Sequence, residues 1–178
     1  NYFDSNGPAA GTNASGDFSW NTTNWTENPD GIEPGGTVVW ENFAGNGAEA
    51  RFSAGVNGIG NITVNADETG IVLTGIDVEE GDVTIAAGSG DLALNGASAE
   101  VNVVGGSTLT IAEPLTNDGA GDPDGINKTN AGTLILTGEN TFTGGTTVSA
   151  GSLVLANATN TLADSGDVTV NGATAILD

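Results

Sequence analysis

Short alternations of apolar and polar residues recur along most of the chain, separated by Gly, Asn, Asp and Thr. Each alternation sends two apolar side chains to the same face, as a β-strand does. We find no segment with convincing helical periodicity, so strands must form the fold. From Gly60 onward the alternating pairs are Ile62/Val64, Ile71/Leu73, Val83/Ile85, Leu92/Leu94, Val101/Val103, Leu109/Ile111, Leu134/Leu136, Thr146/Val148, Leu153/Leu155 and Val168/Val170.

The spacing of these pairs predicts a solenoid. Two early strands occupy roughly 17 to 21 residues, a plausible length for one coil. The best internal match relates residues 132–138 to residues 151–157 at an offset of 19 residues, which would stack Leu134 on Leu153 and Leu136 on Leu155. The predicted fold class is therefore all-β, a parallel β-solenoid. An antiparallel sandwich also contains regularly spaced short strands and is the alternative.

Such a solenoid has two open ends, each of which exposes a strand edge. An exposed edge must be capped or paired with another chain. The apolar strand predicted at residues 173–177 would leave such an edge. This motivates the hypothesis that identical subunits associate end to end.

Residues 1–59 differ in character from residues 60–178, which carry the predicted solenoid. They contain all three tryptophans, Trp20, Trp25 and Trp40, and four of the five phenylalanines. We predict an aromatic-rich N-terminal cap, because large rings shield an open apolar core well. The alternative is an exposed aromatic platform that binds sugars, which would make the chain a carbohydrate-binding module.

Charge and missing residue types exclude several functions. The chain has 23 acidic residues, two basic residues (Arg51 and Lys128), no Cys and no His, and its formal net charge is -21. Without His or Cys there is no Ser-His-Asp or Cys-His catalysis, no disulfide and no ordinary zinc site. Two cations cannot neutralise a row of phosphates, so nucleic acid is not an expected partner. No run approaches the roughly 20 apolar residues of a membrane span, so membrane insertion is not expected either.

The most polar stretch, residues 117–127, contains candidate metal ligands. Asp118, Asp122 and Asp124 could converge on calcium, which prefers hard oxygen ligands. The EF-hand spacing is not met, because Ala120 stands where an oxygen ligand is needed. A solvated insertion loop is the favoured interpretation, with calcium as the alternative, and we predict no other cofactor.

A second acidic cluster is interpreted as a turn that faces water; its members are Asp77, Glu79, Glu80 and Asp82. Paired carboxylates can hydrolyse glycosides. A polysaccharide lyase would also need a basic residue in its groove, and Arg51 and Lys128 are the only choices. We therefore expect no enzyme, with a polysaccharide lyase or hydrolase as the least favoured alternative.

Residues 132–157, GTLILTGENTFTGGTTVSAGSLVLAN, resemble the autotransporter-associated β-strand repeat of bacterial passenger proteins. A Gly-x-Leu-x-Leu-x-Gly strand is followed by Asn140-Thr-Phe-Thr-Gly-Gly-Thr-Thr147 and a second Gly-x-Leu-x-Leu strand. The opening residues Tyr2–Gly7, with the three tryptophans and Ala50-Arg-Phe52, are similar to the start of such proteins. The resemblance implies a right-handed β-helix that is exported to the cell surface. It brings no catalytic residues with it.

These observations predict an extracellular or cell-surface protein with a structural or adhesive role. In one version the rod is part of a long surface passenger. In another it is a filament subunit that joins identical copies, and surface polysaccharide is a further candidate partner. The sequence leaves open whether the chain is a passenger segment or a complete small subunit.

Overall fold

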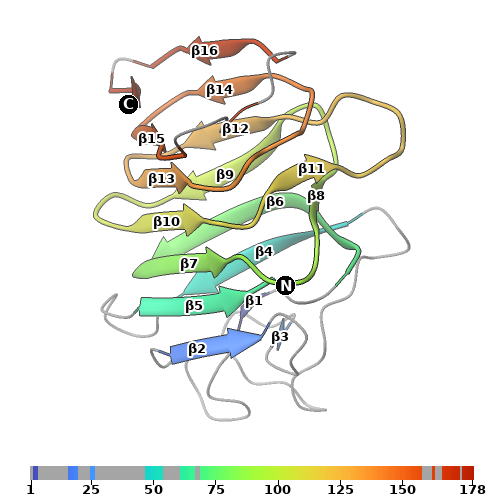
Figure 1. Cartoon of the computed structure of the whole chain (residues 1–178). Helices are drawn as coiled ribbons and strands as arrows, with labels where there is room; N and C mark the ends of the chain where they lie inside the picture. Colours follow the sequence, from blue (N-terminus) through green and yellow to red (C-terminus); the bar gives the residue numbers. More distant parts are fainter. Residues whose placement is uncertain are drawn as a thin grey trace.

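The computed structural model is a stack of coils built from short strands (Figure 1). It describes residues 2–3, 16–19, 25–26, 47–53, 61–66, 69–157, 162, 166–172 and 174–178. Within these ranges there are strands and turns but no helix. The all-β prediction is confirmed.

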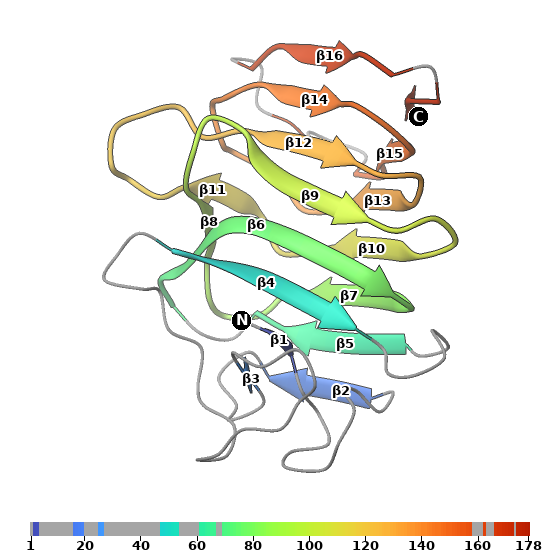
Figure 2. The ribbon, with the colours of Figure 1, turned by 180° about the vertical axis from the view of Figure 1, so that it is seen from behind.

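Two sheets run along the stack, and Figure 2 shows the larger one from its outer side. This first sheet contains β1 (Tyr2–Phe3), β3 (Trp25–Thr26), β4 (Ala48–Ser53), β6 (Ile71–Glu80), β8 (Leu92–Leu94), β9 (Ala99–Val103), β11 (Leu115–Asn117), β12 (Ile126–Thr129), β14 (Thr146–Val148) and β16 (Val168–Val170). The second sheet contains β2 (Gly16–Ser19), β5 (Asn61–Asn65), β7 (Asp82–Ala86), β10 (Thr108–Ile111), β13 (Thr133–Leu136), β15 (Ser152–Leu155) and β17 (Ile176–Leu177).

Successive coils stack in register. In the second sheet Leu134 pairs with Leu153 and Leu136 with Leu155, as the offset of 19 residues predicts. Leu134 also pairs with Leu109 on the coil before. All described strand pairs are parallel except β1 with β3. The parallel solenoid is therefore confirmed, and the antiparallel sandwich is wrong.

Aliphatic side chains fill the space between the sheets. All ten predicted pairs lie on strands, and their inward residues line up from coil to coil. One column of the second sheet contains Val83, Leu109, Leu134 and Leu153, each at most 1% exposed. The corresponding column of the first sheet contains Ala50, Ile76, Val101, Lys128 and Val148. The lysine in this second column is the exception to an apolar interior.

The corners between strands are tightly stacked. Gly132 opens the strand β13, and a Cβ at this position would lie 2.7 Å from both the carbonyl oxygen and a methyl group of Val103 in the coil below. Asn140 is 2% exposed, and its side chain accepts the Leu115 N–H at 2.9 Å and donates to the Gly138 carbonyl at 3.1 Å. Phe142 beside it is also buried. The polar half of the repeat motif is thus a corner that ties one coil to the previous one.

The predicted N-terminal cap is only partly covered by the described ranges. Trp20 and Trp40 lie outside them, as does the side chain of Trp25, so the cap and the sugar platform stay predictions. Strands β2 and β4 fall in this segment, and they pair with β5 and β6. Phe52 on β4 is fully buried in the core.

Strand β6 is longer than the apolar pattern predicts. It has ten residues, and its first half pairs with β8 while its second half pairs with β9. The prediction of a water-facing turn at the second acidic cluster is therefore wrong for Asp77, which lies within β6 and is 8% exposed. The strand continues because Ile76 and Val78 both point into the core.

Candidate functional site

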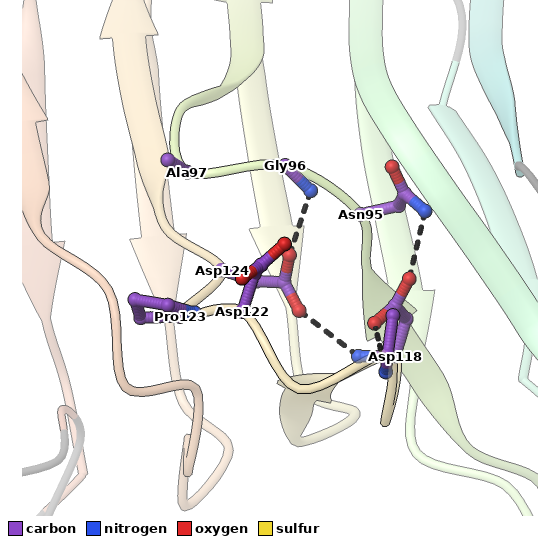
Figure 3. Close-up of a pocket in the computed structure, with 8 residues that line it drawn as sticks. Asn95, Gly96, Ala97, Asp118, Asp122, Pro123 and Asp124 are labelled. Carbon is purple, nitrogen blue, oxygen red and sulfur yellow. Dashed lines mark hydrogen bonds between the residues drawn. The ribbon is translucent and has the colours of Figure 1, made fainter.

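A hollow of about 360 Å³ lies between the corner that follows β8 and the loop that joins β11 to β12 (Figure 3). The loop projects sideways from the stack of coils (Figure 1). Binding residues are often carried on loops that a rigid scaffold positions, so this hollow is a candidate contact site. It is lined by Asn95, Gly96, Ala97, Asp118, Ala120, Asp122, Pro123 and Asp124.

The loop has a defined local conformation. Gly119 and Gly121 have φ values of 84° and 99°, in the left-handed region that glycine adopts readily. Between them, the Ala120 N–H donates to the carboxylate of Asp118 at 2.8 Å, a short turn closed by an aspartate side chain. The loop is therefore shaped by its own residues before any partner binds.

Asp124 anchors this loop to the coil below. It is 2% exposed, and its two carboxylate oxygens accept the Gly96 N–H at 2.6 Å and the Asp118 N–H at 3.0 Å (Figure 3). Its own N–H donates to the side chain of Asn117 at 3.3 Å. Charged acceptors form stronger hydrogen bonds than neutral ones. The buried carboxylate thus holds the loop against the corner at Gly96.

Asp118 is also held by neighbours, whereas Asp122 is exposed. The second carboxylate oxygen of Asp118 accepts the side-chain N–H of Asn95 at 2.7 Å. Asn95 belongs to the previous coil, so Asp118 and Asp124 both tie the loop to the same corner. Asp122 and Pro123, at the tip of the loop, face solvent.

The structure brings the three predicted calcium ligands into one loop and one hollow. Both oxygens of Asp118 and of Asp124 are already hydrogen-bond acceptors within the fold. In the described part of the chain, no group of three or more acidic side chains has an arrangement that could hold a metal ion. Calcium at Asp118, Asp122 and Asp124 stays a prediction, and binding would have to replace these hydrogen bonds.

A second polar group lies on the outer face of β4 and β6. Arg51 contacts Glu49 through two nitrogens, at 2.7 and 2.9 Å, and lies 3.5 Å from Asp77 and 3.6 Å from Glu79. Asp77 also accepts the side-chain N–H of Asn102 on β9 at 2.8 Å. A single guanidinium thus joins three carboxylates on two adjacent coils. We call this group the Arg51 cluster.

The Arg51 cluster has more negative than positive charge. Burial raises the pKa of Asp77, in spite of the opposing effect of Arg51. Burial and the nearby Asp77 carboxylate likewise raise the pKa of Glu79. A charged form that is partly desolvated and close to like charges is disfavoured. The cluster therefore takes up protons more readily than isolated carboxylates do.

The lyase hypothesis gains no support from the positions of the two cations. Arg51 is engaged by three carboxylates, and Lys128 is 0% exposed. The burial of Lys128 is a feature that was not predicted from the sequence. The signal was present in the alternation Ile126-Asn-Lys-Thr129, in which Lys128 shares the inward face with Ile126.

Among the described residues, none belongs to a helix with the length and apolar character needed to cross a bilayer.

Comparison with known proteins gives two matches. Residues 126–155, which contain β12 to β15, match the family model described as the passenger-associated-transport-repeat. Over 160 residues, 85% of the chain, the sequence is 34% identical to a protein named adhesin BmaC autotransporter from Brucella suis biovar 1 (strain 1330). The chain spans 4% of the length of that relative. No solved structure matches the chain.

Proposed function

We propose that the chain is a rigid, non-enzymatic segment of a bacterial surface adhesin, because it contains a passenger-associated-transport-repeat and is similar to an autotransporter adhesin. In this proposal the stacked coils set the distance and orientation of contact loops. The loop between β11 and β12 is the contact element. Its exposed tip, Asp122 and Pro123, is the part that meets a partner.

The observation that supports this proposal most directly is the preorganised loop. Asp118 and Asp124 fix it to the corner at Asn95 and Gly96, so little conformational entropy remains to be lost on binding. A loop held by buried polar groups on a stack of strands has the rigidity that a contact site requires. The relative is named an adhesin, which agrees with a role in attachment.

Charge restricts the chemistry of the partner. With a formal net charge of -21, the chain repels acidic surfaces at low and moderate salt. A neutral or cationic partner fits the loop tip, and we propose a neutral surface polysaccharide or a basic protein surface in preference to an acidic polysaccharide.

A binding assay with loop variants tests the proposal. Beads that carry the chain are incubated with host cells and with an array of neutral and acidic polysaccharides. We expect Asp122→Ala to reduce binding several-fold at unchanged stability, and Asp124→Ala to reduce it further because the loop loses its anchor. Asp167→Ala, at an exposed position that does not line the hollow, is the control and leaves binding unchanged. Equal binding by all four proteins would reject the loop as the contact element.

End-to-end association is a second candidate function. The last described coil exposes four large hydrophobic side chains, and these are Val168, Val170, Ile176 and Leu177 at 41 to 57% exposure. Val168, Val170 and Leu177 continue inner columns of the two sheets, whereas Ile176 pairs with Ser152 on the outer face. We propose that a further coil with the same apolar pattern covers them by the same parallel pairing that joins coils within the chain, and that an identical copy can supply this coil.

The size of the protein in solution tests this association. Light scattering after size separation is carried out at several salt and calcium concentrations, because screening weakens the repulsion between acidic chains. We expect assemblies that grow with salt in the wild type and are lost in Val170→Lys. A wild type that is monomeric under all conditions would reject the filament.

A further inference from the structure

Lys128 occupies a position where the pattern of the core calls for an aliphatic residue. On β12 it lies between Val101 of β9 and Val148 of β14, and all three residues are 0% exposed. Lysine is almost never fully buried unless it is paired. The side chain must therefore find its partners inside the fold.

Those partners are backbone carbonyls at two stacked corners. The ammonium nitrogen donates to the carbonyl oxygens of Thr129 at 2.6 Å and Asn130 at 2.9 Å, in its own coil. It also donates to the carbonyl of Ala150 at 3.4 Å, in the next coil. Asn130 has a left-handed φ of 61°, which makes the sharp corner. An ammonium has three N–H donors, and each has one carbonyl here.

No titratable side chain faces the ammonium within the described ranges. Glu100 is the one acidic residue on β9; it is exposed, and its carboxylate accepts the Thr129 hydroxyl at 2.8 Å. Strands β13, β14 and β15 carry no titratable residue. Burial alone lowers the pKa of Lys128 from 10.5 to about 8. The side chain therefore changes its charge close to neutral pH.

We propose that Lys128 is a proton-operated latch between two coils, in which the ammonium holds the Ala150 carbonyl and the neutral amine releases it. A neutral amine has two N–H donors and a lone pair, so one of the three carbonyls loses its donor. The bond to Ala150 is the longest of the three and the one that reaches the next coil. Its loss loosens the corner between β14 and β15 while the strand pairing remains.

The latch has a definite effect on stability. Because the folded pKa is lower than the unfolded one, the folded state releases its proton first as the pH rises. The free energy of unfolding is then constant below about pH 8 and increases between pH 8 and 10.5. The corner between β14 and β15 loosens in this pH range. The folded state nevertheless becomes more stable, because it no longer buries a charge without a counterion.

Nuclear magnetic resonance on the wild type tests the latch without any substitution. The Lys128 ammonium nitrogen and the Ala150 carbonyl carbon are followed from pH 6.5 to 10. We expect both to titrate with the same midpoint near 8. The Leu136 carbonyl, which accepts the Ala156 N–H at 2.9 Å, is the internal control and does not titrate. A Lys128 midpoint near 10.5, or an Ala150 carbonyl that is unchanged while Lys128 titrates, would overturn the proposal.

Two variants give an independent measurement. Lys128→Met keeps the buried hydrocarbon and removes the titrating group, and Lys128→Arg keeps the charge throughout this pH range. We expect the urea midpoint of the wild type to rise between pH 8 and 10, and that of both variants to stay level. A wild-type slope that persists in Lys128→Met would assign the pH dependence to another group and reject the latch.

Discussion

The two cations of this chain lie in opposite environments. Arg51 is on the outer face of the first sheet, where it is surrounded by more carboxylates than it can neutralise. Lys128 is in the core, where it has three carbonyls and no carboxylate. The planar guanidinium suits several carboxylates at once, and the compact ammonium suits three converging carbonyls.

This difference shows that cation placement here follows hydrogen-bond geometry and not charge balance. The surface near Asp77 keeps an excess of negative charge, and the core near Lys128 keeps an uncompensated positive charge. Protonation at low pH therefore reduces the excess negative charge near Asp77, and deprotonation at high pH removes the buried positive charge of Lys128. The substitutions below test whether the two regions differ in this way.

The largest expected effect is that of removing the buried cation. Lys128→Ala leaves a cavity and three carbonyls without their donor, so we expect the free energy of unfolding to fall by about 2 to 5 kcal/mol. Arg51→Ala is the matched substitution at the surface, and its expected loss is about 1 kcal/mol. Urea denaturation at pH 7 measures both. A larger loss for Arg51→Ala would reverse the comparison.

Close packing around the Lys128 corner gives the second expected effect. Gly132→Ala places a methyl group against the Val103 backbone, and we expect a loss of about 1 to 3 kcal/mol. Gly105→Ala is the control, because its new Cβ would meet only the Ala131 Cβ at 3.4 Å, and its expected change is within about 0.5 kcal/mol. Thermal unfolding distinguishes the two. Equal losses of stability in the two variants would mean that Gly132 is needed for its backbone flexibility and not because a Cβ would clash.

A smaller effect is expected when the positive charge at position 51 is kept and the planar guanidinium is replaced by an ammonium. Arg51→Lys cannot contact Glu49 through two nitrogens, so we expect a loss of roughly 0.5 kcal/mol, less than that of Arg51→Ala. Urea denaturation at low and high salt measures the difference. If Arg51→Lys and Arg51→Ala lose equal stability, this region is stabilised by the geometry of the guanidinium and not by its charge.

The smallest effect at pH 7 is expected for Asp77→Asn, which changes the pH dependence instead. The pKa of Asp77 is raised in the folded state, so its contribution favours folding at low pH and is lost as the pH rises through the folded pKa. The wild type should therefore gain stability on mild acidification, and Asp77→Asn should gain less. Urea midpoints between pH 7 and pH 4 provide the measurement. Thr74→Ala, at an exposed and non-titrating position of the same strand, is the control and keeps the wild-type slope.

The stacking of coils could be predicted because it depends on short-range features. Alternation of period two places Leu134 and Leu136 on one face, and the repeated motif gives the offset to Leu153 and Leu155. The ten-residue length of β6 could not be predicted in this way. Its second half carries Asp77, Glu79 and Glu80, which look like a turn until Arg51 from the previous coil is placed beside them.

The roles of the loop aspartates and of Lys128 depend on contacts between coils. In the sequence, Asp118 and Asp124 stand in a glycine-rich loop and therefore suggest a metal site. Their partners in the fold, Asn95 and Gly96, are distant in sequence, so these hydrogen bonds could not be predicted. Lys128 meets Ala150 only after β14 has stacked on β12. The sequence shows which side chains are polar, but their hydrogen-bond partners are known only once the coils are stacked.

The stacking of each coil on its neighbours alone has a mechanical consequence. Each inner coil of the described stack contacts the coil before it and the coil after it, so the structure is close to one-dimensional. A force that pulls the two ends of such a stack apart is borne by the hydrogen bonds of one terminal coil at a time. We therefore expect the chain to peel coil by coil at low force. Such a segment lengthens stepwise under tension and absorbs work before it breaks.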